Sequence, residues 1–152
     1  MNQAVAVDLN RHSWRWRACG LLAGLIFLTG CAATSPHRFA QPSPGWETRS
    51  GQLLYRNGQT TLIGDVVVRF SKTGDLDLTF SKGPGLVLLT VREDSSFADV
   101  KGVLARNGWS GPIDRAPVQL RGWLGLRDEL VRPPHRQVIR YQTGTQSFLF
   151  QF

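Results

Sequence analysis

Strict alternation of apolar and polar residues is the feature of this chain that most constrains its fold. Every second side chain is apolar in residues 65–71, and residues 75–81 repeat the pattern. Because successive side chains of a β-strand point to opposite faces, each run describes a strand with one buried face. The inward row predicted in this way consists of Val66, Val68, Phe70, Leu76, Leu78 and Phe80.

Turn signals divide the rest of this region into further strands. Asn57-Gly58 suits the positive φ angles of a tight hairpin turn, which would join strands at 52–56 and 60–63. Gly83-Pro84-Gly85 separates residues 75–81 from a strand at 86–92. The pattern therefore predicts an antiparallel meander.

The periodicity weakens after that point and then changes. Residues 93–96 are typical of a polar turn, residues 97–104 form a weaker strand candidate interrupted by Gly102, and residues 107–112 have the composition of a loop. Pro117 suits the first turn of a helix. An apolar stripe compatible with one helix follows it, made of Leu120, Trp123, Leu124, Leu130 and Val131.

Packing must hold this helix in place, because Gly122 and Gly125 each weaken it by about 1 kcal/mol relative to alanine. Pro133-Pro134 ends it, and strands at 137–142 and 147–152 follow around Thr143-Gly144. The sequence thus predicts a mainly β domain with the order meander, one helix, hairpin.

The N-terminal region has the features of a lipoprotein signal peptide. Arg11, Arg15 and Arg17 precede an apolar run at 18–28, and Leu28-Thr29-Gly30-Cys31 matches a lipobox. This interpretation removes residues 1–30 and makes Cys31 the lipidated first residue, held in a membrane by its acyl chains. The alternative is an ordinary signal peptide, or an uncleaved anchor, with a cysteine near its end.

The remaining residues 31–152 number 122 and suit one domain. Their 15 Lys and Arg exceed their 10 Asp and Glu by 5, but without a basic run, and an exported lipoprotein is not expected to bind nucleic acid. Cys19 leaves with the leader, so no disulfide forms. Prolines at 36, 42 and 44 indicate that residues 31–45 form a tether before the domain at 46–152.

The residues give no support for an enzyme, a metal site or a cofactor. Gly108-Trp109-Ser110-Gly111 lacks one residue of a nucleophile elbow. His37 lies in the tether and His135 follows two prolines, so neither is expected beside a carboxylate. Asp75 and Asp77 alternate with leucines, which is typical of the solvated side of a strand.

In three segments the chain resembles the LolB family, outer-membrane receptors that take lipoproteins from a periplasmic carrier. These are Gly51-Gln52-Leu53-Leu54-Tyr55, Gly83-Pro84-Gly85-Leu86, and the segment from Pro117 to Leu124. The resemblance implies a curved antiparallel sheet, or incomplete β-barrel, with one covering helix. It also implies an outer-membrane location facing the periplasm, with acyl chains, lipidated proteins or a periplasmic carrier as partners. Ala32, where an aspartate would signal inner-membrane retention, agrees with that location.

The resemblance further implies that inward side chains line a cavity for acyl chains. The candidates are Val66, Val68, Phe70, Leu76, Leu78, Phe80, Leu88 and Trp123. Pro84 and Leu86 would form a membrane-insertion loop, although Gly85 stands where the family has its exposed leucine. The chain also has room for only two strands after the helix. The alternative is a lipoprotein with a filled core that docks a protein or envelope partner through strand edges or the Trp109 loop.

Overall fold

The computed structural model describes residues 37–152. The predicted signal peptide, Cys31 and the first part of the tether lie outside the described residues. Among the residues described, no helix is both long enough and apolar enough to cross a membrane.

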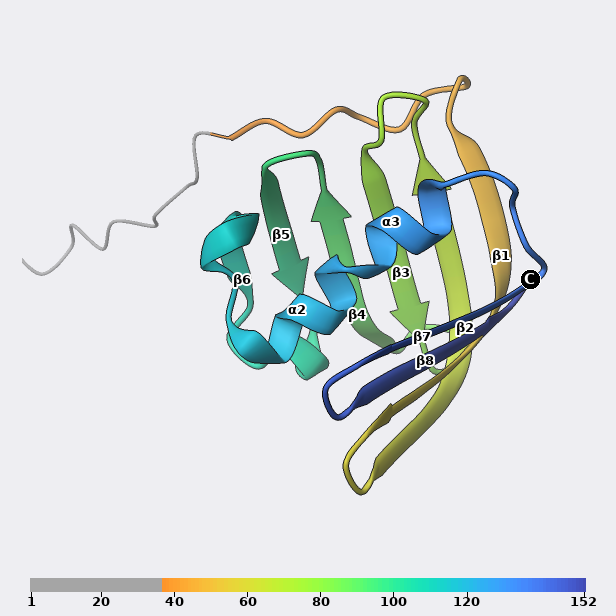
Figure 1. Ribbon diagram of the computed structural model, residues 1–152, viewed down its shortest axis with the longest axis vertical. Coiled ribbons are helices and arrows are strands. Elements are labelled where there is room, and N and C mark those ends of the chain that lie inside the picture. The colour runs from red at the N-terminus through yellow and green to blue at the C-terminus, as the bar shows by residue number, and fades with distance from the viewer. Residues whose placement is uncertain (1–36) are drawn as a thin grey trace, which may run out of the picture. The chain divides into compact units, whose positions relative to one another are not determined.

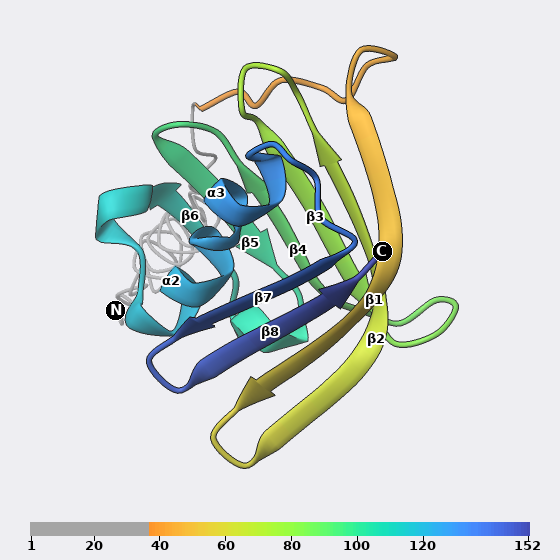
Figure 2. The ribbon, with the colours of Figure 1, turned by 45° about the vertical axis from the view of Figure 1, so that its right-hand side comes forward.

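Eight antiparallel strands form one sheet in the order β6-β5-β4-β3-β2-β1-β8-β7 (Figure 1). The strands are β1 (Glu47–Asn57), β2 (Thr60–Phe70), β3 (Leu76–Ser81), β4 (Val87–Glu93), β5 (Phe97–Lys101), β6 (Trp109–Pro112), β7 (Val138–Thr143) and β8 (Gln146–Gln151). The sheet is strongly curved and is not closed, since β6 and β7 are its two edges (Figure 2). The predicted incomplete barrel is confirmed.

The predicted hairpin at residues 57–58 is confirmed, but its second strand is longer than expected. Residues 60–63 and 65–71 were predicted as separate strands, whereas Thr60 to Phe70 form the single strand β2. Gly64 makes this possible, because a Cβ there would lie 2.1 Å from the carbonyl oxygen of Ser81 on β3. Only glycine lets the two strands approach so closely.

The alternation in β2 and β3 places side chains as predicted, and all six residues of the inward row are buried. On β4 the pattern is interrupted by a register shift opposite Phe80 and Ser81. This bulge adds one residue to β4, so the consecutive Leu88 and Leu89 are both buried.

The prediction for residues 97–112 is partly wrong. The strand at 97 ends at Lys101, because Gly102 adopts φ +113° and packs against the backbone of Leu88, and a 3₁₀ turn, η1 (Val103–Ala105), follows. The segment predicted as a loop contains β6, which pairs with β5 from Trp109 to Pro112. A second 3₁₀ turn, η2 (Ile113–Arg115), leads from β6 to the helices.

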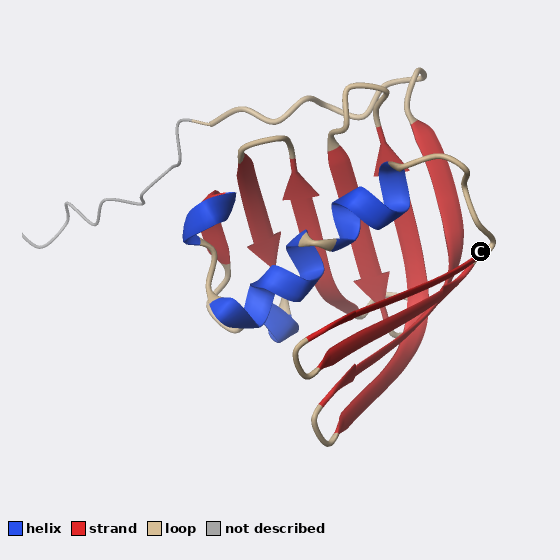
Figure 3. Cartoon of the chain, in the orientation of Figure 1, coloured by secondary structure: helices blue, strands red, loops and turns tan. Residues whose placement is uncertain are grey.

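The predicted helix is present as two short helices, α2 (Val118–Leu124) and α3 (Leu126–Val131). The chain stays helical at the junction, where the Gly125 N–H donates to the carbonyl oxygen of Arg121 at 2.9 Å. A side chain at position 125 would collide with the hydroxyl of Tyr141 on β7. The helices lie across the concave face of the sheet (Figure 3), where Leu120, Trp123, Leu124 and Leu130 are buried.

Replacing Trp123, which is 1% exposed, tests how strongly the helices are held to the sheet. We expect Trp123→Ala to lower the free energy of unfolding by about 3–5 kcal/mol, because it removes a large buried aromatic group. Val118→Ala, on the same helix but 72% exposed, is the control. Denaturant unfolding measures both, and equal small effects would show that the helix does not depend on Trp123.

Candidate functional site

The candidate site is the concave face of the sheet together with the helices that cover it. All eight residues predicted to line a cavity belong to one buried cluster in this space. The cluster also includes inward residues that the sequence analysis did not single out, among them Leu53, Leu89, Val91, Phe148 and Phe150. These residues all occupy inward positions on strands. The alternation of apolar residues in β1, β4 and β8 could have identified them.

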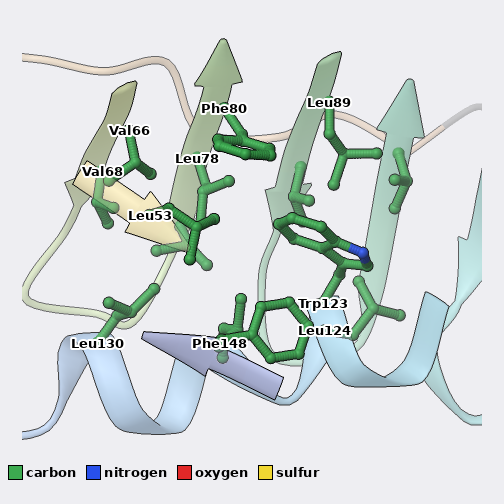
Figure 4. Packing of buried hydrophobic residues seen from close by; sticks show 14 of the residues in the cluster. Leu53, Val66, Val68, Leu78, Phe80, Leu89, Trp123, Leu124, Leu130 and Phe148 are labelled. Atoms are coloured by element: carbon green, nitrogen blue, oxygen red, sulfur yellow. The ribbon is translucent and has the colours of Figure 1, made fainter. Parts of the chain in front are cut away.

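Trp123 lies at the centre of this cluster and contacts aromatic rings from three strands. Its ring centroid lies 4.8 Å from Tyr55 on β1, 4.9 Å from Phe148 on β8 and 5.9 Å from Phe80 on β3. Figure 4 shows Trp123 projecting from α2 toward Phe80 and beside Phe148. The side chains predicted as a cavity lining therefore pack on one another and on the helix in this structure.

One buried polar side chain ties β8 to this aromatic group. Gln146 is 6% exposed, and its Nε2 donates to the hydroxyl of Tyr55 at 2.9 Å and to the carbonyl oxygen of Gln119 at 3.0 Å. Both bonds satisfy an amide that would be costly to bury alone. No signal in the sequence distinguished this glutamine from the exposed polar residues around it.

A second buried polar residue, Glu93, lies at the end of β4. It continues the inward row of Leu89 and Val91, is 3% exposed, and its Oε2 has no hydrogen-bond partner among the described residues. Burial raises the pKa of this carboxyl to about 8, against the attraction of Arg127 and with the repulsion of Asp128 and Asp94. Glu93 is therefore mostly protonated at neutral pH.

Glu93 lies on the wall of an open cleft of about 490 Å³. The cleft separates the end of β4 from η2 and from the junction of α2 and α3. Its polar walls include Glu93, Ser95, Asp114, Arg121, Arg127 and Asp128, and Leu124 is among its apolar residues. Leu124 also belongs to the buried cluster, so the cleft adjoins the apolar interior.

The residues predicted for membrane insertion lie at the other end of β4. Pro84 is exposed and Leu86 is 49% exposed, in a loop closed by a 2.9 Å bond from the Lys82 N–H to the Leu86 carbonyl oxygen. The adjoining Val87 is 45% exposed. The loop thus presents apolar side chains to solvent, away from the buried cluster.

His37 and His135 both lie beside carboxylates, contrary to prediction. His37 Nε2 is 2.5 Å from Asp94 Oδ2, and its ring stacks on Phe97 at 4.3 Å. His135 Nε2 is 3.3 Å from Glu47 Oε2. In the predicted tether, His37 thus contacts the sheet, and Arg92 Nη2 donates to the carbonyl oxygen of Ala40 at 3.3 Å.

The contact between His37 and Asp94 fixes the N-terminal segment to the turn after β4. Partial burial raises the pKa of Asp94. Hydrogen bonds from the N–H groups of Ser96 and Phe97, together with the contact with His37, lower it by more, so the net shift of the pKa is downward. Within residues 37–152, no three His, Cys, Asp or Glu side chains are grouped as metal ligands would be.

Comparison with known proteins gives distant relatives of one kind, while no family model matches the chain. Outer-membrane lipoprotein LolB of Shewanella sp. strain MR-4 is 28% identical over 144 residues, covering 82% of this chain and 67% of the relative. LolB of Shewanella loihica is 27% identical over 144 residues, which cover 82% of this chain and 65% of the relative. LolB of Shewanella frigidimarina is 25% identical over 130 residues, which cover 73% of this chain and 64% of the relative. The chain thus spans about two thirds of the length of these relatives.

The raised pKa of Glu93 makes the stability of the fold depend on pH. Unfolded chains release this proton near the ordinary value of 4.5, whereas the folded chain keeps it to about pH 8. The free energy of unfolding should therefore fall as pH rises between these values, by up to roughly 3 kcal/mol at pH 7.

Glu93→Gln should remove this pH dependence, because the amide does not titrate. The free energy of unfolding of the variant should therefore increase relative to the wild type as pH rises from about 5 to about 8. Glu129→Gln, which changes an exposed carboxyl on α3, is the matched control. Denaturant unfolding at several pH values measures the slopes. Identical slopes for the wild type and Glu93→Gln would contradict the assignment.

Proposed function

Starting from distant homology to outer-membrane lipoprotein LolB, we propose that this protein is a lipid-anchored component of lipoprotein localisation at the outer membrane. Its site would hold the acyl chains of lipidated proteins between the concave sheet face and α2–α3. The observation that carries this proposal is a continuous apolar sheet face that, within residues 37–152, is covered by two helices of only seven and six residues.

The cover is suited to displacement. Isolated helices shorter than about 12 residues are marginal in water, so α2 and α3 are held by the packing of their apolar side chains on the sheet. An acyl chain gains about 25 cal/mol for each Å² of apolar area removed from water. A chain that enters beneath Trp123 replaces apolar contacts with apolar contacts, and the predicted lining residues would then contact it.

The docked N-terminal segment suggests how the domain is oriented on its anchor. Six peptide units separate Cys31 from His37, which span at most about 20 Å. With lipid on Cys31, the end of the sheet that carries Asp94 and Phe97 would therefore face the membrane. An insertion role for Pro84 and Leu86 requires release of this segment, because their loop lies at the opposite end of β4.

The second candidate function is docking of a protein or envelope partner by a domain with a filled core. The packing of Trp123 on three other aromatic rings favours it, because these side chains contact one another where an acyl chain would lie. The edge strands β6 and β7 would provide the docking surface, and Val138 on β7 is 48% exposed.

Two tryptophan substitutions on neighbouring residues of β3 separate these functions. Leu78 is fully buried on the concave face, whereas Thr79 points to the other face. If acyl chains bind beneath the helices, the wild type binds a fluorescent fatty acid, Leu78→Trp weakens that binding, and Thr79→Trp does not. Leu78→Trp also costs about 1–3 kcal/mol through overpacking, so thermal unfolding is measured alongside. A wild type that binds no fatty acid would leave only the docking function.

The anchor is tested by metabolic labelling with a fatty-acid analogue. Cys31→Ser should abolish labelling and membrane retention, because the lipidated thiol is lost. Cys19→Ser, in the segment predicted to be removed, is the matched control and should be labelled like the wild type. Labelling that persists in Cys31→Ser would contradict both the anchor and the proposed location.

A further inference from the structure

We propose that the cleft beside Glu93 recognises the carbonyl group, ester or amide, through which an acyl chain is attached to the rest of its molecule. The inference rests on the proposed function, since it assigns the polar end of the same ligand. The cleft is defined as the space between the end of β4, η2 and the junction of α2 and α3.

One oxygen of the Glu93 carboxyl makes no hydrogen bond within residues 37–152. Its Oε2 is buried without a partner among the described residues, although the side chain lines a cleft of about 490 Å³. An orphaned buried polar atom destabilises the fold, and a hydrogen bond to a ligand atom in the cleft would recover that loss. As a neutral acid, the group has one O–H to donate, and a carbonyl oxygen is the complementary acceptor.

The charged groups around Glu93 are engaged elsewhere or exposed. From α3, Arg127 Nε donates to the carbonyl oxygen of Gly74 at 2.6 Å, and the side chain of Asp128 is 70% exposed. From α2, Arg121 Nε donates to the carbonyl oxygen of Ala116 at 3.2 Å.

The remaining neighbours come from the turns. In the turn after β4, Asp94 accepts from the N–H groups of Ser96 and Phe97 and contacts His37. Asp114 of η2 lines the far side of the cleft. None of these groups is hydrogen-bonded to the free oxygen of Glu93.

The inward row of β4 leads from this point into the core. Val91 and Leu89 precede Glu93 in the inward row of β4, and Leu124 belongs both to the cleft and to the buried cluster. A carbonyl held at Glu93 would therefore direct its chain along β4, beneath the helices, toward Phe80 and Trp123. The cleft favours a neutral group over an anion such as phosphate, because Asp114 and Asp128 offset the charges of Arg121 and Arg127 on its walls.

Displacement of a fluorescent fatty acid from the full chain, held in amphipol, tests the inference. The competitors are monooleoylglycerol, which has an ester, N-oleoylethanolamine, which has an amide, and the oleyl ether of glycerol, which has no carbonyl. At pH 6.5 (~1.5 units below the pKa) we expect the ester or the amide to bind roughly three- to tenfold more tightly than the ether. Preference between ester and amide identifies the source of the carbonyl.

Two variants isolate the role of the Glu93 carboxyl. Glu93→Gln keeps a donor that does not titrate, so it should retain the preference for ester over ether both at pH 6.5 and at about pH 9. The wild type should lose that preference at about pH 9, when the acid ionises. Glu93→Leu should lose it at both pH values while binding the ether normally.

The outcomes distinguish the two proposals. If the ester, the amide and the ether bind the wild type equally, or if Glu93→Leu keeps the preference, the acyl site stands and the carbonyl site is overturned. If neither the fatty acid nor any competitor binds, the proposed function fails and the carbonyl site fails with it.

Discussion

The packing of Trp123 into the concave face of the sheet is the interaction on which the rest of this structure depends. It joins α2 to β1, β3 and β8, which are far apart in the sequence. The helix thereby covers the open, curved sheet and completes one core. Together with the buried leucines of α2 and α3, this contact holds the short helices on the sheet and keeps its apolar face out of water. Under the proposed function, an entering acyl chain would have to displace this contact.

Much of the fold was predictable because the strands have one buried face. In β2 and β3 a shift of one residue would turn the whole apolar row toward solvent, so the alternation determined both the strands and their orientation. β6 was not predictable, because Trp109-Ser110-Gly111-Pro112 shows no alternation and becomes a strand only through its pairing with β5. The continuity of β2 through Gly64 depends on the close approach of Ser81, which no local signal reveals.

The apolar part of the candidate site was predictable for the same reason, whereas its polar part was not. Glu93 was assigned to a polar turn because its charge outweighed its place in the inward row after Leu89 and Val91. Gln146 and the docking of His37 depend on partners distant in the sequence. The resulting site combines an apolar interior with one protonated carboxyl at its opening. Such an arrangement suits a ligand with an apolar chain and a neutral polar end.

Acyl binding on the concave face requires that α2 and α3 separate from the sheet while the sheet stays folded. Native-state hydrogen exchange of backbone amides, followed as a function of denaturant, tests it most directly. We expect amides of α2 and α3 to exchange through an opening of lower free energy than those of β2 and β3, and a bound fatty acid to change their exchange. If the amides of α2, α3, β2 and β3 all exchange with one free energy, through global unfolding alone, the account is contradicted.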